Sequence, residues 1–353
     1  MSGLHVSDDY NRRLVPGLFP FQTIPSFTFV PDILLVKTSS LGDVVHNLPV
    51  VSDIALHLGH ARIDWVVEEA FAPVVWLHPA VRNVIPCTLR RWSRNLAQRD
   101  TWAGIGALRA TLRSTSYDAI IDTQGLLKSA LLTSLARGVS HGLDWRSSRE
   151  PLRWFYDHVY AVPRDRHAVE RNRALAGLVL GYTPEGPPRY SLTAPTTRAP
   201  SLALPATPAG FLVLLHATSA DRKLWPEDRW RALAAQLRDR GCGCVLVWGN
   251  PIEQERAHRI AAGNDAAMVL PTLDLPALAD VLSAARGVVG VDTGLTHLAA
   301  ALGQPTVGIY VDTDPGATGV LASCAENVGS IGHPPEVADV MAALDRVDTW
   351  KAA

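Results

Sequence analysis

Asp43 follows a short apolar run and a polar loop, an order of residues that positions a carboxylate for chemistry. Residues 33–36 are apolar, residues 37–42 form a small polar loop with the sequence KTSSLG, and a helical pattern begins at residue 43. Strand, loop and helix in this order put the loop at the carboxyl edge of a parallel sheet. The loop hydroxyls, among them that of Ser40, and the adjacent carboxylate predict a site for a polyhydroxylated acceptor beside a base.

This loop does not match the phosphate-binding loops of common nucleotide-binding folds. Gly42 is its only glycine, whereas a dinucleotide fold needs GxGxxG and a P-loop needs GxxxxGK[ST]. A second glycine pair, Gly104 and Gly106, lies inside a helical pattern and not after a strand. An oxidoreductase that uses a nicotinamide cofactor therefore remains only as a rival hypothesis, one that lacks its expected motif.

Asp292, Thr293 and Gly294 come directly after another apolar run, at the start of a helix that includes His297. Backbone N–H groups at a helix start, with a hydroxyl and a glycine that permits close approach, suit a diphosphate. Asp292 would then accept hydrogen bonds from sugar hydroxyls. The alternative is that Asp292 and Thr293 only cap the helix.

Two further strand ends in the same half carry polar residues. Thr218, Ser219 and Lys223 follow the run 211–216, and a lysine at this edge can neutralise charge that develops on a departing phosphate. A surface lysine is the alternative. Glu253 follows the next strand, where it can accept hydrogen bonds from ribose hydroxyls or interact with the helix dipole. Because three consecutive strand ends converge, they predict one site more strongly than any of them alone.

Arginines in the first half could recognise an acid group. Arg90 and Arg91 follow the apolar segment near residue 85, and Arg149 lies in the segment GLDWRSSREP. Arginine binds carboxylate and phosphate in a bidentate manner, although exposed arginines without a ligand are the common alternative. The sequence DTD at 312–314 resembles a metal-binding motif, but no cluster of His or carboxylate residues supports metal ligation there.

Length and composition bound the class of protein. The 353 residues, 47% hydrophobic and 19% charged, suit two α/β domains with well-buried sheets. Four scattered cysteines indicate reduced, buried thiols, which agrees with a cytoplasmic protein. No run reaches the roughly 18 apolar residues that span a bilayer, and the first 30 residues lack the apolar core of a signal peptide.

The charge is distributed unevenly along the chain. Residues 1–200 carry 22 Lys and Arg against 17 Asp and Glu, whereas residues 201–353 carry 11 against 17. The basic half is the better candidate for an anionic partner, such as a phosphorylated lipid or an acid sugar, with a chance distribution as the alternative.

Apolar runs and helical patterns alternate in both halves, which predicts two parallel sheets with helices on both faces. Seven prolines between residues 183 and 210 predict an interdomain linker. We therefore expect an extension over 1–30, an acceptor-binding domain over 31–182, the linker over 183–210 and a donor-binding domain over 211–353. The predicted strands are 33–37, 63–67, 84–86, 119–122, 211–216, 243–248, 268–270, 288–291 and 306–309; the predicted helices are near 43–58, 102–115, 126–137, 167–180, 227–240, 252–263, 275–286, 294–302 and 336–350.

These segments together resemble the heptosyltransferases of lipopolysaccharide synthesis. The resemblance covers about residues 32–320, in order and with matching spacing, and fits the first heptosyltransferase better than the second. It rests on KTSSLGDVVHNLP, DWVVEE, RRW, DTQGLLKSA, HGLDWRSSREP, HAVER, LLHATS with Lys223, WGNPIEQER and VDTGLTHLAAAL.

The resemblance implies a GT-B fold, in which two Rossmann-like domains of doubly wound α/β structure face a cleft. It also implies ADP-L-glycero-β-D-manno-heptose as donor, the Kdo of lipid A as acceptor, and no metal or other cofactor. Its matches make Asp43 the catalytic base and Lys223 a catalytic and donor-site residue. The other donor-site matches are Thr218, Ser219, Glu253, Leu273, Asp292, Thr293, Gly294 and His297; the acceptor-site matches are Ser40, Arg90, Arg91 and Arg149.

The predicted reaction is an inverting glycosyl transfer. Asp43 would take a proton from a Kdo hydroxyl while that oxygen attacks the anomeric carbon of the heptose, and Lys223 would stabilise the departing ADP. Because the acceptor is a lipid, we expect peripheral association with the cytoplasmic face of the inner membrane and no nucleic-acid partner. Transfer to heptose, as by the second heptosyltransferase, and a non-catalytic protein that binds sugar nucleotides remain as alternatives.

Overall fold

The computed structural model describes residues 30–193, 204–347 and 350. The predicted extension over 1–30 lies almost entirely outside this range, as does the middle of the predicted linker, 194–203. No helix in the described part combines the length and apolar character that a membrane-spanning helix requires.

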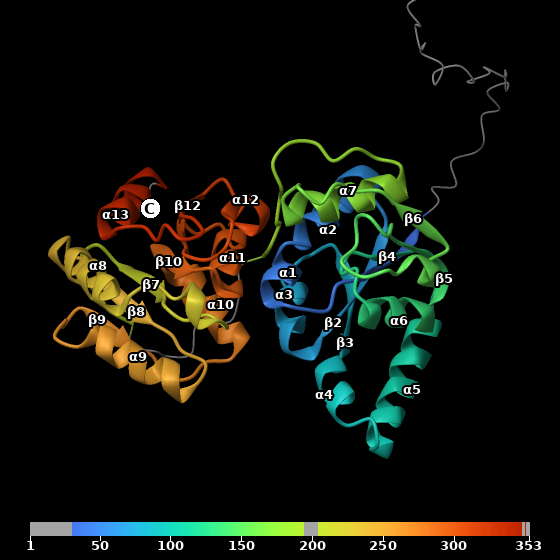
Figure 1. Ribbon diagram of the computed structural model, residues 1–353, viewed down its shortest axis with the longest axis horizontal. Helices are drawn as coiled ribbons and strands as arrows, with labels where there is room; N and C mark the ends of the chain where they lie inside the picture. Colours follow the sequence, from blue (N-terminus) through green and yellow to red (C-terminus); the bar gives the residue numbers. More distant parts are fainter. Residues whose placement is uncertain (1–29, 194–203, 348–349, 351–353) are drawn as a thin grey trace, which may run out of the picture. The chain divides into compact units, whose positions relative to one another are not determined.

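The first sheet has six parallel strands in the order β3-β2-β1-β4-β5-β6, which is the doubly wound arrangement (Figure 1). It is covered by helices on both faces, as the burial of β1 demonstrates. Ile33 and Leu35 belong to one apolar cluster, whereas Leu34 and Val36 belong to another. A strand buried on both faces must be apolar throughout, which is why this run was recognisable. The elements are β1 (Asp32–Val36), α1 (Leu41–Val45), α2 (Leu48–Leu58), β2 (Arg62–Glu68), η1 (Glu69–Phe71), α3 (Ala72–Trp76), β3 (Val81–Cys87), α4 (Leu89–Arg94), α5 (Arg99–Arg113), β4 (Ser116–Asp122), α6 (Leu127–Leu135), β5 (Arg137–Leu143), η2 (Arg153–Phe155), β6 (His158–Tyr160) and α7 (Ala168–Leu180).

The second sheet repeats this topology with six parallel strands in the order β12-β11-β10-β7-β8-β9. Trp225 and Trp230 are fully buried and pack in the same apolar cluster as Leu212 and Leu214 of this sheet. We call the sheet β1–β6 with its helices the first lobe, and β7–β12 with its helices the second lobe. The elements of the second lobe are β7 (Phe211–Leu215), η3 (Asp221–Lys223), α8 (Glu227–Asp239), β8 (Gly243–Leu246), α9 (Pro251–Ala261), β9 (Ala267–Val269), α10 (Leu275–Ala284), β10 (Gly287–Val291), α11 (Gly294–Ala301), β11 (Thr306–Tyr310), α12 (Pro315–Thr318), β12 (Ala325–Gly329) and α13 (Val337–Arg346).

The predicted element order differs from the structure in several places. The short helices α3, α4 and α12 were not predicted. The helix predicted over 43–58 is two helices, because Pro49 has no N–H to donate to the carbonyl of Val45 and the helix breaks before it. Strands β5, β6 and β12 were missed. Strand β5 was missed because it contains Gly142 and lacks a continuous apolar run. Glycine is needed there because a Cβ would collide with the ring of Tyr156.

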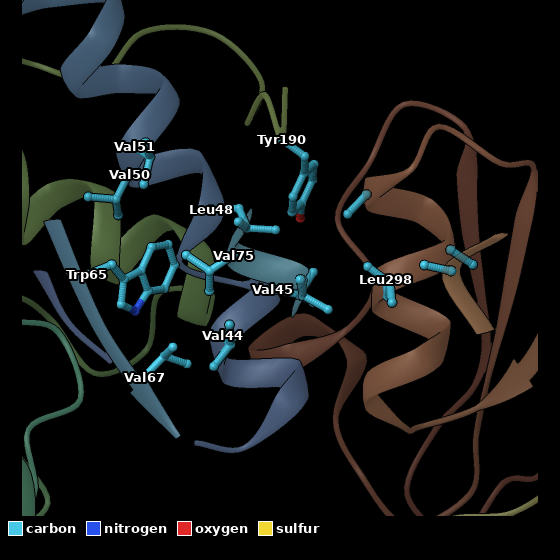
Figure 2. Close-up of a cluster of buried hydrophobic side chains, with 14 of the residues drawn as sticks. Val44, Val45, Leu48, Val50, Val51, Trp65, Val67, Val75, Tyr190 and Leu298 are labelled. Carbon is cyan, nitrogen blue, oxygen red and sulfur yellow. The ribbon is translucent and has the colours of Figure 1, made fainter. Parts of the chain in front are cut away.

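An apolar cluster joins the two lobes beside the carboxyl edges of β1 and β10. Val44, Val45 and Leu48 of α1 and α2 pack in the same cluster as Leu298 of α11 (Figure 2). Tyr190, from the segment after α7, also belongs to it and donates a hydrogen bond to the carbonyl of Leu321 (2.9 Å). Helices α1 and α11, which begin at the predicted reactive loops, are therefore held against each other.

Candidate active site

Asp43 lies in the first turn of α1, and its contacts are confined to its own loop. The backbone N–H and the hydroxyl of Ser40 both donate to one carboxylate oxygen of Asp43, at 2.8 and 3.1 Å. Ser40 is the N-cap of α1, so the pair forms a capping box that orients the carboxylate. Among the described residues Asp43 forms no ion pair, which leaves its second oxygen available to a substrate.

The loop before Asp43 is tied to the loop that follows the neighbouring strand β4. The Lys37 ammonium donates to the Thr123 carbonyl (2.8 Å), and the Gln124 side-chain carbonyl accepts from the backbone N–H groups of Thr38 (3.0 Å) and Ser39 (3.2 Å). These bonds arise because β1 and β4 are paired in parallel and end at the same edge. Gln124 therefore has a positioning role in this loop.

A small cavity of about 70 Å³ opens beside Asp43 within the first lobe, and its walls are cationic. Lys37, Arg149 and Arg171 all line it. Burial lowers the pKa of Lys37, with smaller effects from Arg149 and Arg171, while Asp43 acts in the opposite direction. Burial, followed by Arg149, likewise lowers the pKa of Arg171. A buried lysine with a half-buried and an exposed arginine around one cavity suits a ligand that carries a carboxylate or phosphate.

A larger cavity of about 360 Å³ lies on the other side of Asp43 and is shared by the two lobes. The first lobe contributes the start of α1 and the second contributes the ends of β7 and β10. Asp43 is the residue of the predicted site that lines both cavities. The predicted residues that line the larger cavity are Ser40, Asp43, Thr218, Ser219, Lys223, Asp292, Thr293, Gly294 and His297.

Asp292 is enclosed by donors, unlike Asp43. Its carboxylate accepts from Lys223 (2.7 Å) and Thr313 (2.9 Å), and His297 Nε2 lies 3.6 Å away. Burial raises the pKa of Asp292, but the contacts with His297, Lys223 and Thr313 outweigh it and hold the pKa well below its usual range. The N-cap of α11 is Thr293, so Asp292 is not the capping residue of this helix.

The starts of α1 and α11 touch backbone to backbone. A Cβ added at Gly294 would lie 2.6 Å from Leu41 Cβ and 2.9 Å from the backbone nitrogen of Gly42, so only glycine permits this approach. The contact continues through His46, whose Nε2 lies 3.2 Å from Nδ1 of His297. Burial, and then the nearby His297, lowers the pKa of His46 well below its ordinary value.

Some predicted residues lie away from this group. Glu253 accepts from the Gly249 N–H and the Asn250 amide (both 2.7 Å) and so closes the start of α9, while Leu273 is half-buried against the apolar core. Neither lines the shared cavity. In the sequence DTD at 312–314, which resembles a metal-binding motif, Asp312 accepts a hydrogen bond from Arg222, and Asp314 caps α12. Across the described ranges, no three His, Cys, Asp or Glu side chains form a group that could hold a metal.

The basic residues predicted for the acceptor are also divided between cavities. Arg149 lies with Asp43 in the small cavity, whereas Arg91 lines a separate cavity of about 520 Å³ beside β3 and α5. Arg90 lies over the ring of Phe71, 5.6 Å from its centre, and Phe71 lines the shared cavity. Sequence reasoning missed Arg171 and Thr313. Arg171 is the last residue of the segment HAVER, whose resemblance was a usable signal, whereas Thr313 had none.

Two doubly wound α/β lobes with a charged cavity between their carboxyl edges define a GT-B glycosyltransferase. Comparison with known proteins agrees: the model of glycosyltransferase family 9 (heptosyltransferase) matches residues 105–343. The chain belongs to this family.

Its relatives include lipopolysaccharide heptosyltransferase 1 of Escherichia coli K12, which is 44% identical over 290 residues and covers 81% of this chain and 90% of the relative. The enzyme of the same name from Pseudomonas aeruginosa is 46% identical over 301 residues, covering 84% and 83%. The solved structure of E. coli heptosyltransferase WaaC with ADP is 41% identical, covers 90% of this chain and 99% of that chain, and superposes with a TM-score of 0.82.

Proposed function

We propose that this glycosyltransferase moves L-glycero-D-manno-heptose from ADP-heptose to the Kdo of Kdo-bearing lipid A. The relatives named heptosyltransferase 1, at 44% and 46% identity, support the reaction, and the WaaC structures titled with ADP and with ADP-2-deoxy-2-fluoro heptose support the donor. The observation that carries the proposal is the position of Asp43 in the wall between two cavities, one cationic and one shared with the second lobe.

The acceptor sugar would occupy the small cavity. Kdo carries a carboxylate, for which Lys37, Arg149 and Arg171 offer three positive charges. In that position a Kdo hydroxyl can approach the free oxygen of Asp43, while the Ser40 donors hold the other oxygen. Asp43 would accept the hydroxyl proton as the acceptor oxygen attacks the anomeric carbon from the side opposite the leaving ADP. This single displacement inverts the anomeric configuration.

The diphosphate of the donor would lie in the shared cavity. Lys223 and the backbone N–H groups at the start of α11 can interact with the charge that develops on departing ADP. We propose that these groups supply the stabilisation, with no metal required. Turnover that is unchanged in the presence of a chelator such as EDTA would support this assignment, and loss of turnover that Mg²⁺ restores would contradict it.

The acceptor lipid places the reaction at a membrane, and we propose that the protein works as a peripheral protein on the cytoplasmic face of the inner membrane. Support comes from the charge asymmetry, since the half of the chain that contains the cationic cavity is the basic half.

Turnover with defined substrates tests the function. The purified chain is incubated with ADP-heptose and Kdo-bearing lipid A, and both ADP release and the mass of the lipid product are measured. We expect heptose addition to the Kdo acceptor and none to an acceptor that already carries the first heptose. Transfer only to the second acceptor would assign the activity of a heptosyltransferase II. Tight ADP-heptose binding without transfer to either acceptor would indicate a non-catalytic binding protein.

A further inference from the structure

Most of the exposed large apolar side chains of the described chain belong to the first lobe. All four strongly exposed tryptophans of the described chain are in this lobe, and Trp154 is the most exposed at 88%. Trp225 and Trp230 of the second lobe are fully buried by comparison. Single exposed leucines are ordinary, but a group of exposed tryptophans and leucines marks an interaction surface.

Four of these residues come from segments that adjoin one another. Leu127 and Leu131 are one turn apart on the outer face of α6 and are 47% and 51% exposed. Trp154 lies in η2, which packs against α6 through the cluster of Ala130 and Leu152. Trp145 lies in the loop after β5. We call Leu127, Leu131, Trp145 and Trp154 the apolar patch.

Arginines accompany the patch and form no ion pair within the described chain. Arg146 lies over the ring of Trp145 and Arg153 over the ring of Trp154, at 5.0 and 5.8 Å from the ring centres. Residues 90–153 contain eleven Lys and Arg but five Asp and Glu. Within this described segment none of the eleven forms an ion pair, so their charge remains available to an anionic partner.

The patch adjoins the cationic cavity. Leu126, directly before Leu127, lines that cavity together with Asp43, and so do Ser147 and Ser148, just after Trp145 and Arg146. The Lys128 ammonium, between the two exposed leucines, donates to the hydroxyl of Ser39 in the loop before Asp43 (3.0 Å). The same two segments therefore line the cavity with some residues and present apolar side chains to solvent with others.

From this juxtaposition we propose that the apolar patch is the surface on which the enzyme rests on an anionic lipid bilayer, so that the lipid-borne acceptor sugar enters the cavity directly. The proposal rests on the proposed function for the identity of the acceptor. Tryptophan and leucine enter the interfacial region, and the arginines bind anionic headgroups. A bilayer fits better than a protein partner because the patch combines unpaired cations with apolar groups beside a site for a lipid-linked sugar.

Vesicle binding tests this surface. The full chain is sedimented with phosphatidylcholine vesicles that contain or lack phosphatidylglycerol. The variant combines Leu127→Ser, Leu131→Ser and Trp154→Ser, and Ile331→Ser, which removes an exposed side chain of the second lobe, is the matched control. We expect the triple variant to bind anionic vesicles at least tenfold more weakly and Ile331→Ser to bind like the wild type. Arg146→Gln with Arg153→Gln should reduce the salt dependence of binding.

Turnover separates this proposal from the proposed function. The triple variant should lose activity toward Kdo-bearing lipid A in vesicles by a similar factor while it keeps wild-type activity toward a deacylated, water-soluble Kdo acceptor. Wild-type vesicle binding by the triple variant would overturn the proposal. If the wild type formed a dimer and did not bind vesicles, and the triple variant were a monomer, the patch would instead be the interface with a second copy of the chain. If the wild type bound vesicles through the patch but transferred heptose to neither acceptor, the proposed function would be wrong. The proposed role of the patch in membrane binding would stand.

Discussion

Each lobe places a carboxylate after a central strand of its sheet, but the surroundings of the two carboxylates differ. Asp43 follows β1 and Asp292 follows β10, each beside a helix start that includes a glycine. Asp43 receives hydrogen bonds only from its own loop, whereas Asp292 receives them from Lys223 and Thr313. A carboxylate with a free oxygen can accept a proton, while one enclosed by donors can only hold its neighbours in place. The difference supports the proposal that Asp43 transfers the proton and that Asp292 holds the groups that bind the donor.

The lobes also differ in whether their arginines form ion pairs. In the second lobe, arginines such as Arg229, Arg240 and Arg256 form ion pairs with acids of that lobe. In the described part of the first lobe, the arginines between residues 90 and 153 form none. In the first lobe Arg62, Arg82 and Arg173 also form ion pairs, so the charge that remains available to a partner is that of the arginines between residues 90 and 153.

Exchanging the two carboxylates for amides is the strongest way to break this comparison. Asp43→Asn should lower kcat by about 10²–10⁴-fold, the usual contribution of a general base, and leave ADP affinity nearly unchanged. Asp292→Asn should instead weaken ADP-heptose binding, because Lys223 and His297 lose the anion that holds them. Steady-state kinetics and calorimetric ADP titration measure both effects. Near wild-type kcat in Asp43→Asn would show that Asp43 is not the base.

The positions of the polar residues that follow the strands were predictable, because parallel strands bring their carboxyl ends to one edge of the sheet. Asp43, Lys223 and Asp292 could therefore be selected from position alone. Glu253 was selected by the same argument, but its carboxylate accepts a hydrogen bond from the Gly249 N–H at the start of α9, and its own N–H donates to the Asn250 side chain. The strand pattern does not reveal such local hydrogen bonds. The pairing of Lys223 with Asp292 depends on how two loops fold toward each other, so it required the structure.

The limits of the fold prediction have a similar cause. Strand β7, and strand β1 after its first residue Asp32, are apolar because helices cover both faces, and such runs stand out in a sequence. Strand β12 lies at the edge of its sheet and reads AENVG, with partly exposed residues. Edge strands and strands that need glycine for packing do not carry that pattern. The predicted domain boundaries, which depend on the proline-rich segment over 183–210, remain a prediction.

Acid should destabilise both lobes, because each buries at least one histidine whose pKa lies far below its ordinary value. Burial lowers the pKa of His78 in the first lobe and of His216 in the second, each to about 4. An unfolded histidine titrates near 6.5, so between these values the unfolded chain binds more protons. Stability is then complete above about pH 6.5 and falls as the pH decreases toward 4. From pH 7 to pH 5 each histidine should cost about 2 kcal/mol.

Urea unfolding at the two pH values measures this loss in the wild type and in His78→Gln and His216→Gln. Each variant should be less stable than the wild type at pH 7 but should lose about 2 kcal/mol less on acidification, because one titrating group is gone. Equal reductions in both variants would show that the lobes differ at their surfaces and not in their cores. If neither variant reduced the loss, other groups would have to account for the acid sensitivity.

The smallest expected effect tests the contrast between the arginines directly. Arg229 of the second lobe donates to Glu336 (2.6 Å) and to the Pro335 carbonyl (2.8 Å), whereas Arg109 on α5 is exposed and has no ion pair within the described chain. Arg229→Gln should lower the free energy of unfolding by about 1 kcal/mol, less at high salt, and Arg109→Gln should change it by less than about 0.5 kcal/mol at any salt concentration. Thermal unfolding at low and high salt compares the two variants. An equal, salt-dependent loss in both would mean that the arginines of the first lobe also stabilise the fold, and their charge would then not be reserved for a partner.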